Sequence, residues 1–326
     1  MKQNDILIVS GRDLLTLSLE MHGKDCLQTT SDCFEAYKLC RADRRLSFCV
    51  VDCDWFGIEA LSLIRAIREN LSFVYPCILA VASSSQDARL ALIVGADAVF
   101  QDLSVVRDLV PSATERKDEL FNLNAFVDFV KQLIENSDSS VFQHCKNTAI
   151  ISMALAAISL QDSNNPAFIR ALKAAALFHD LGKIFVPRDI LQKPSRLTAK
   201  EFEVMKTHTT TGAHLFYQAL KFASDNDVLL ACAQVCLYHH EKYDGSGYPQ
   251  GLVAQQIPLP ARIVAIADVF DALSSERCYR QAYKPEDALQ IMKEQESGHF
   301  DPQLLSVFLD SAEIFLEMKR FRECKQ

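Results

Sequence analysis

The most apolar helical segments in the second half of the chain carry histidines and aspartates, and this combination limits how the chain can fold. The groups are His179-Asp180 after Ala174–Phe178, His239-His240 after Val228–Tyr238, and Asp268 within Ile263–Phe270. A buried charge without a partner is costly, so each group must be neutralised. A salt bridge would suffice for one His-Asp pair, but three such groups without a shared cation would each be strongly unfavourable. The pattern therefore predicts a metal cluster that joins several helices.

Imidazole and carboxylate groups supply the candidate ligands of this cluster. They are His144, His179, Asp180, His208, His239, His240 and Asp268. Such ligands suit iron, manganese, zinc, nickel or cobalt, and the absence of thiolates among them argues against a zinc finger. The chain has eleven cysteines but no C-x-x-C pair, so we expect reduced and mostly buried thiols.

Short apolar runs alternate with amphipathic segments in the first part of the chain. The predicted strands are Ile6–Val9, Phe48–Cys53, Cys77–Ala82 and Ala98–Phe100, and the predicted helices are Leu14–Met21, Ser31–Leu39, Ile58–Glu69 and Gln86–Val94. Apolar strands separated by helices are typical of a parallel sheet that is covered on both faces. We therefore predict an α/β fold for this part.

The second part of the chain has helical spacing almost throughout. After a polar stretch at Pro111–Glu119, a helical pattern at Leu120–Val130 either ends the first domain or connects the two domains. A loop with a capping residue follows at Asn136–Ser140. We predict a first domain at residues 1–136 and an all-α domain at residues 137–326.

Net charge and apolar runs exclude several classes of protein. The formal net charge of −8 argues against a DNA-binding scaffold. The start of the sequence lacks the pattern of a secretory signal, and the longest apolar run, Ala149–Leu160, is too short to span a membrane. We expect a cytoplasmic protein that binds neither DNA nor a membrane.

The motifs of the second part resemble the HD-GYP family, a branch of the HD-domain metal-dependent phosphohydrolases. The similar segments are His179–Lys183, Met205–His208, His239–Pro249, Ala267–Leu273 and Gly298–Pro302, within a match from about Val141 to Glu317. The resemblance implies hydrolysis of a cyclic dinucleotide, chiefly cyclic di-GMP, at a binuclear or trinuclear metal centre that often holds iron. Manganese, nickel and cobalt are alternatives to iron.

The same resemblance assigns ligands to each metal ion. It implies that His144, His179, Asp180 and Asp268 bind one ion, and that Asp180, His208, His239 and His240 bind the second. Asp180 would bridge the two ions. Trinuclear members have a glutamate where this chain has Ser140, which favours two ions over three.

The resemblance also implies that further residues contact the substrate or assist catalysis. Lys183 resembles the lysine that contacts the scissile phosphate, and Gly247-Tyr248-Pro249 resembles the loop that shapes the pocket. Arg277 and Arg280 occupy positions where the family has basic residues, with a solvated helix end and a surface ion pair as alternatives. Tyr248 either stacks on a base or packs as an ordinary aromatic. Asp271 either orients a ligand or donates a proton, or else caps a helix or pairs with Arg277.

The predicted reaction is attack on phosphorus by a hydroxide that bridges two metal ions. The expected products from cyclic di-GMP are linear pGpG and also GMP. One alternative is an HD phosphohydrolase for another nucleotide, such as cyclic GMP-AMP. Another is a catalytically silent HD fold that only binds partners.

The first part of the chain resembles a response-regulator receiver domain, which has the flavodoxin-like fold. Asp52 followed by Gly57 is similar to the phosphoacceptor loop. Ser10-Gly11 replaces the acidic pair that binds Mg²⁺, and Asp102 replaces a lysine. Because phosphoryl transfer to a carboxylate needs a cation, we predict that Asp52 is not phosphorylated. The domain would then dock a protein partner or form a homodimer.

Overall fold

The structure is a computed structural model with two compact units. It describes residues 6–12, 27–42, 46, 48–70, 76–103, 130, 132, 139–160, 165–221, 227–276, 281–295 and 298–323. One unit comprises Met1–Asn124 with Gln161–Ile169, and the other comprises Ala125–Leu160 with Arg170–Gln326. The predicted boundary at residues 136–137 lies outside the described residues and stays a prediction.

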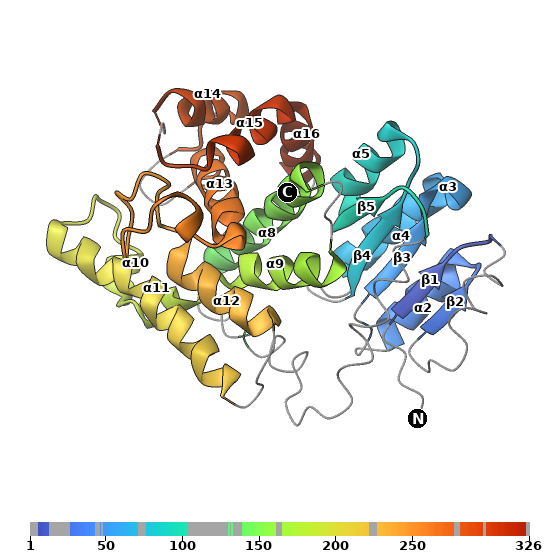
Figure 1. The fold of residues 1–326 in the computed structure, drawn as a ribbon, viewed down its shortest axis with the longest axis horizontal. Helices are drawn as coiled ribbons and strands as arrows, with labels where there is room; N and C mark the ends of the chain where they lie inside the picture. The colour runs from blue at the N-terminus through green and yellow to red at the C-terminus, as the bar shows by residue number, and fades with distance from the viewer. Residues whose placement is uncertain are drawn as a thin grey trace. The chain divides into compact units, whose positions relative to one another are not determined.

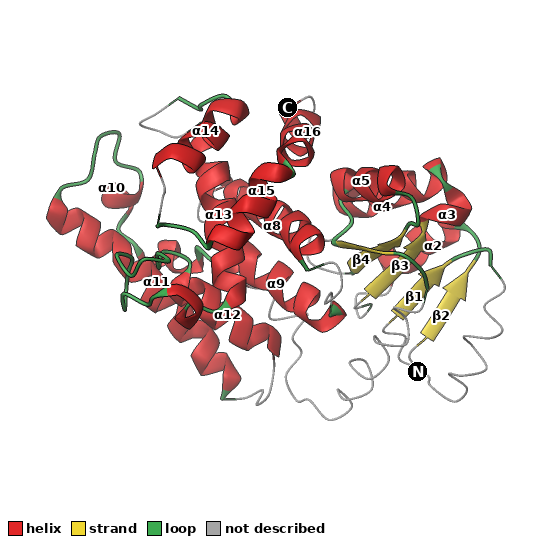
Figure 2. Cartoon of the chain, turned by 45° about the horizontal axis from the view of Figure 1, so that its top comes forward, coloured by secondary structure: helices red, strands yellow, loops and turns green. Residues whose placement is uncertain are grey.

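A parallel sheet with the strand order β2-β1-β3-β4-β5 forms the centre of the first unit (Figures 1 and 2). The strands are β1 (Ile6–Val9), β2 (Leu27–Thr30), β3 (Phe48–Asp52), β4 (Cys77–Val81) and β5 (Ala98–Phe100). This is the order of flavodoxin-like folds. It agrees with the predicted α/β class and is consistent with a receiver-like domain, which stays a prediction.

Strand β2 is the strand that the sequence analysis missed. Its sequence, LQTT, has one apolar residue, and only Thr30 is buried. An edge strand pairs on one side alone, so it needs no continuous apolar run. The other four strands lie where they were predicted, with ends that differ by at most one residue.

Four described helices belong to the first unit. They are α2 (Cys33–Ala42), α3 (Cys53–Phe56), α4 (Ile58–Asn70) and α5 (Ser85–Val94). Alternate side chains of β1, β3 and β4, among them Val9, Val51 and Ala80, pack with α2, α4 and α5 in one apolar core. The predicted helix Leu14–Met21 lies outside the described residues, as does the predicted helix Leu120–Val130 except for its last residue.

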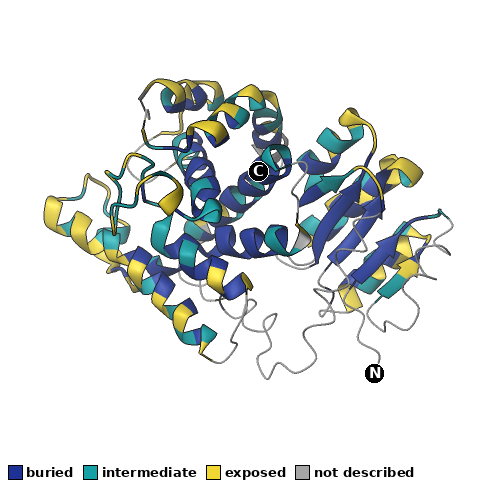
Figure 3. Cartoon of the chain, in the orientation of Figure 1, coloured by how far each residue is buried: buried dark blue, intermediate teal, exposed yellow. Residues whose placement is uncertain are grey.

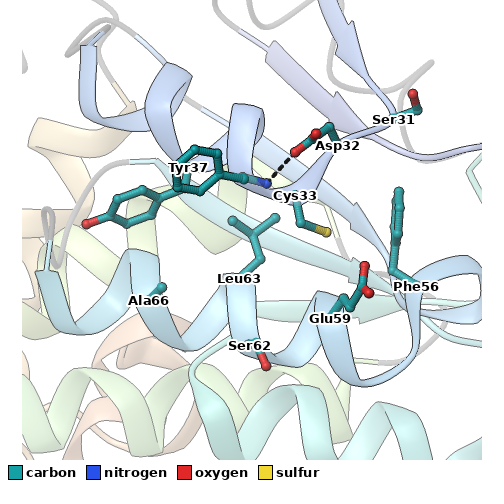
Figure 4. A pocket seen from close by; sticks show the side chains of 10 residues that line it. Ser31, Asp32, Cys33, Tyr37, Phe56, Glu59, Ser62, Leu63 and Ala66 are labelled. Carbon is teal, nitrogen blue, oxygen red and sulfur yellow. Dashed lines mark hydrogen bonds between the residues drawn. The ribbon is translucent and has the colours of Figure 1, made fainter.

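A shallow pocket lies between α2 and α4 in the first unit (Figure 4). Tyr37, Phe56 and Leu63 give it an apolar lining, and Glu59 contributes a carboxylate. The side chain of Phe34, which also lines the pocket, is largely exposed. This part of the unit therefore presents aromatic groups to solvent.

The regular elements described in the second unit are helices. They are α8 (Ser139–Ser159), α9 (Pro166–Phe178), η1 (Leu181–Phe185), α10 (Arg188–Leu191), α11 (Ala199–Leu220), α12 (Asp227–Tyr238), η2 (Ala254–Gln256), α13 (Leu259–Ser274), α14 (Pro285–Gln295), α15 (Pro302–Asp310) and α16 (Ala312–Glu323). Helices α8, α9 and α13 are mostly buried, whereas α11 and α14 each expose one side (Figure 3). A bundle of this kind agrees with the predicted all-α class. None of the described helices is long and apolar enough to cross a membrane.

A glycine allows two of these elements to approach closely. A Cβ atom at Gly182 in η1 would lie 1.9 Å from the carbonyl oxygen of His208 in α11. Any side chain at residue 182 would therefore push η1 away from α11. This contact brings His179-Asp180, which precede η1, close to His208.

Candidate metal centre

Five segments of the second unit bring the seven predicted ligands together. His144 lies on α8, His179-Asp180 follow α9, His208 lies on α11, His239-His240 follow α12, and Asp268 lies on α13. Two groups of three residues each place one ligand atom apiece within 4.8 Å of one another. One group is His144, His179 and Asp268, and the other is His208, His239 and His240.

The carboxylate of Asp180 lies between the two groups. Its Oδ2 atom is 3.3 Å from Nε2 of His179 and 3.9 Å from Nε2 of His144. Its Oδ1 atom is 3.4 Å from Nε2 of His208 and 3.8 Å from Nε2 of His239. One oxygen therefore faces each group, as a bridging carboxylate would.

Main-chain carbonyl groups determine the tautomers of three histidines. The Nδ1 atom of His179 lies 2.8 Å from the carbonyl oxygen of Ala176. The Nδ1 atoms of His208 and His239 lie 2.7 and 2.8 Å from the carbonyl oxygens of Met205 and Val235. A carbonyl oxygen can only accept, so each Nδ1 carries the proton and donates it. In each neutral ring the Nε2 lone pair then points into the cluster.

These lone pairs need a cation. Nε2 of His208 and Nε2 of His239 face each other at 3.4 Å. Burial lowers the pKa of His208 to about 4 and the pKa of His239 to about 3, so neither ring holds a second proton at neutral pH. Two facing acceptors without a proton between them repel each other, and a metal ion resolves that repulsion.

Two buried atoms of the cluster lack hydrogen-bond partners. They are Nε2 of His179 and Oδ1 of Asp180. A buried polar atom without a partner costs free energy, and such exceptions call for a ligand or ion. Imidazole nitrogens and carboxylate oxygens are suitable donors for divalent transition metals. The residues present therefore fit a metal site, and this cluster could bind metal ions.

A series of polar contacts links His144 to Asp271 and Lys319. Its Nδ1 lies 2.7 Å from Oδ2 of Asp271, and its Nε2 lies 2.9 Å from Oδ1 of Asp268. Lys319 of α16 donates to Oδ1 of Asp271 at 3.4 Å and to Ser275 at 2.8 Å. The fully buried Asp271 thus contacts the Nδ1 atom of the candidate ligand His144, which is where carboxylates lie behind metal-bound histidines.

The protonation of Asp271 bears on its two predicted roles. Burial acts to raise its pKa, but the hydrogen bond with His144 and the charge of that ring lower the pKa to about 2. An ionised carboxylate cannot donate a proton at neutral pH. The geometry therefore favours the orienting role over the proton-donating role.

Lys183 and the glycine-rich loop lie next to the ligands. Nζ of Lys183 is 2.5 Å from Oδ2 of Asp180. The main chain of Tyr248 donates to the carbonyl of His240 at 3.2 Å, and its ring stacks on the His240 ring with centroids 4.9 Å apart. Gly247 is required because a Cβ atom there would lie 2.2 Å from the nitrogen of Lys242. Pro249 follows Tyr248 through a cis peptide bond.

Three residues near the cluster were missed from the sequence. Cys145 lies on the apolar helix α8, Lys319 lies on the charged helix α16, and Glu241 follows the histidine pair. The Sγ atom of Cys145 lies within 4.8 Å of ligand atoms of His179 and Asp180, and burial raises the pKa of this thiol. Glu241 accepts hydrogen bonds from the main chain of Gln250 and Leu252 and so holds the loop closed. Lys319 lies among other charged residues of α16, so its sequence context gave no signal for it.

Two predicted substrate contacts cannot be placed. Arg277 and Arg280 lie outside the described residues, so their assignment stays a prediction.

Asp52 of the first unit is fully buried at the end of β3. Its carboxylate forms an ion pair with Arg12 at 2.9 Å and accepts a hydrogen bond from Ser10 at 2.7 Å. The main-chain nitrogen of Trp55 also donates to it. The guanidinium group of Arg12 thus compensates the charge of Asp52.

Comparison with known proteins identifies a family for the second unit. A profile described as an HD domain matches residues 128–304. The cyclic di-GMP phosphodiesterase PA4108 of Pseudomonas aeruginosa is 34% identical over 237 residues, which cover 72% of this chain and 52% of that protein. The cyclic di-GMP phosphodiesterase response regulator RpfG of Xanthomonas campestris pv. campestris is 46% identical over 141 residues, covering 43% of this chain and 36% of that protein.

The name of a third relative specifies a different substrate. The 3'3'-cGAMP-specific phosphodiesterase 2 of Vibrio cholerae is 35% identical over 148 residues, which cover 45% of this chain and 27% of that protein. The chain therefore spans about half or less of the length of these three relatives.

Metal binding should release protons at neutral pH. Burial acts to lower the pKa of His144 and of His179, but carboxylates outweigh burial and raise both. A ligand nitrogen carries no proton, so these rings lose protons when a metal binds, whereas His208 and His239 have none to lose. Calorimetric titration with Mn²⁺ at pH 7, in two buffers of different ionisation enthalpy, should show net proton release that declines as the pH rises. Binding without proton release would contradict the assignment.

Replacing Lys319 should weaken metal binding. Lys319→Met keeps the length of the side chain but removes the contact that orients Asp271, and loss of such outer contacts costs about 10–100-fold in metal affinity. Mn²⁺ titration of the metal-free protein measures the effect. Arg320→Met is the matched control because Arg320 pairs with Glu286 at the exposed surface. If Lys319→Met and Arg320→Met bound Mn²⁺ with equal affinity, this would contradict the role of Lys319 in positioning Asp271.

Proposed function

This chain belongs to the HD domain family, and on that premise we propose that it is a metal-dependent phosphodiesterase that hydrolyses a cyclic dinucleotide. Cyclic di-GMP is the substrate we favour, with linear pGpG and GMP as products. The proposal is supported by the names of PA4108 and RpfG, which are cyclic di-GMP phosphodiesterases. Cyclic GMP-AMP is the second candidate because another relative is named as specific for it.

The observation that carries this proposal is the pair of facing Nε2 atoms of His208 and His239, 3.4 Å apart. Their partners on Nδ1 leave both atoms as acceptors, and a bound cation would satisfy both. We propose two ions, one held by His144, His179 and Asp268 and one held by His208, His239 and His240, with Asp180 shared. The donor set suits iron, with manganese, nickel or cobalt as alternatives.

Several residues of the chain would each have a separate role in hydrolysis. Divalent ions, when bound, acidify water and offset negative charge on the phosphate. Lys183 would contact the scissile phosphate, since its Nζ lies at the edge of the cluster beside Asp180. Asp271 would hold His144 in orientation through Nδ1. The loop at Gly247-Tyr248-Pro249, closed by Glu241, would cover the side next to His240.

We further infer that the first unit is a receiver-like module that works without phosphoryl transfer. The ion pair between Arg12 and Asp52 supports this inference, since it already supplies the positive charge that Mg²⁺ provides in a phosphorylated site. Such a module would dock a partner or a second copy of the chain. The exposed aromatic groups around the α2–α4 pocket support docking.

Removal of one ligand should abolish both metal binding and turnover. His208→Ala is expected to lower kcat/KM for cyclic di-GMP by more than about 100-fold, which exceeds the loss of an outer contact, and to lower the metal content. His214→Ala is the matched control, because His214 lies on the same helix but is exposed and contacts Gln218. The measurements are elemental analysis and product chromatography after anaerobic purification. A fully metallated protein that hydrolyses no cyclic dinucleotide would disprove the proposed activity.

Acetyl phosphate should leave Asp52 unmodified. The carboxylate is buried and its charge is already compensated by Arg12, so attack on a phosphoryl donor is disfavoured. Intact-mass spectrometry after incubation with acetyl phosphate and Mg²⁺ should show no added phosphate. A phosphate that appears on the protein and is lost in Asp52→Asn would contradict this inference.

A further inference from the structure

An exposed phenylalanine lies beside the metal centre of the second unit. Phe202 on α11 is 45% exposed. Its ring meets the ring of Tyr248 edge-on, with centroids 6.2 Å apart and an interplanar angle of 81°. Tyr248 in turn stacks on His240, one of the candidate ligands. Phe202 is therefore two ring contacts away from the cluster, and part of its surface faces solvent.

A lysine accompanies this ring. Lys206 lies one helical turn after Phe202, and its Nζ is 5.3 Å from the centroid of Phe202 and 5.5 Å from the centroid of Tyr248. It also pairs with Glu203 at 2.7 Å, but the Glu203 side chain is 70% exposed. Ion pairs at exposed positions contribute little free energy, so an anionic ligand can displace Glu203.

The start of α11 holds these side chains in place. Thr198 and Glu201 form a capping box at the first turn, and Lys193 pairs with Glu201 at 2.6 Å. Phe202 directly follows Glu201, so its ring is carried by a fixed helical turn. A preformed surface of this kind loses less conformational entropy when a ligand binds.

The combination of an exposed ring and a cation suits a nucleotide. A flat base gains about 1–3 kcal/mol by stacking on an aromatic side chain. A lysine ammonium group binds phosphate as a compact point charge. We infer that Phe202 and Lys206 form a subsite for the purine and phosphate of the dinucleotide half that is not cleaved. This inference rests on the proposed function and adds residues that hold the substrate outside the metal centre.

Loss of the ring should raise KM and leave kcat nearly unchanged. Removing one base-stacking contact corresponds to a rise in KM of about 5-fold to 150-fold. We expect this rise for cyclic di-GMP in Phe202→Ala and in Phe202→Leu, since leucine keeps apolar contact with Tyr248 but has no aromatic face. Phe202→Trp should retain the wild-type KM. Tyr217→Ala is the matched control because it removes a partly exposed ring from the far end of the same helix.

A small substrate separates binding at the subsite from chemistry at the metal ions. Bis(4-nitrophenyl) phosphate has neither a purine nor a second phosphate, so Phe202→Leu should lower its kcat/KM much less than that of cyclic di-GMP. Lys206→Gln should raise KM for cyclic di-GMP and reduce its dependence on salt, and Lys206→Arg should restore part of the affinity. An equal effect of Phe202→Leu on both substrates would overturn the subsite, because it would indicate a disturbed metal centre.

The outcomes distinguish the subsite from the proposed function. If wild type hydrolyses cyclic di-GMP and Phe202→Leu has the same KM, the subsite is wrong and the function stands. If wild type binds cyclic di-GMP in equilibrium dialysis without hydrolysing it, and Phe202→Leu weakens that binding, the subsite stands and the function is wrong. If wild type neither binds nor hydrolyses any cyclic dinucleotide, both are wrong.

Discussion

Hydrogen bonds from histidine Nδ1 atoms to main-chain carbonyl groups are the interactions on which the rest of the site depends. They place the protons of His179, His208 and His239 on the outer side of each ring. In a neutral ring the inner nitrogen is a lone-pair donor, and those of His208 and His239 face each other and Asp180. Because burial keeps His208 and His239 neutral, the space between their two Nε2 atoms is electron-rich and holds no proton. Buried acceptor atoms without donors are unfavourable in a protein core, but they suit a bound metal ion.

Contacts around the cluster hold its residues in this arrangement. Gly182 allows η1 to lie against α11, so that Asp180 reaches the two histidine groups. Lys319 of α16 contacts Asp271, whose Oδ2 lies 2.7 Å from Nδ1 of His144. Glu241 closes the loop next to His240 through two main-chain hydrogen bonds. Each contact acts on a ligand through its neighbour, and such outer contacts commonly determine metal affinity.

The two units neutralise a buried aspartate in different ways. In the first unit, Asp52 receives a guanidinium group, a hydroxyl group and a main-chain N–H, and its hydrogen-bonding capacity is used. In the second unit, Asp180 has Lys183 next to Oδ2, but its Oδ1 has no hydrogen-bond partner. Both oxygens of Asp52 have partners within the chain, whereas Oδ1 of Asp180 has no hydrogen-bond partner and can bind an ion. The open oxygen of Asp180 therefore makes the second unit the candidate site for metal chemistry.

The sequence by itself determined the element types, four of the five strands and the residues that could bind metal, because apolar periodicity and ionisable groups on apolar helices are local signals. It missed β2, whose sequence LQTT has little apolar character, and Lys319, which lies far from the ligands along the chain. Only the tertiary structure decided that His144 and Asp271 share a hydrogen bond across 127 positions. It also decided which nitrogen of each ring faces inward and that Phe202 lies beside Tyr248. These properties depend on how helices pack and on which carbonyl each ring meets, and no local pattern encodes them.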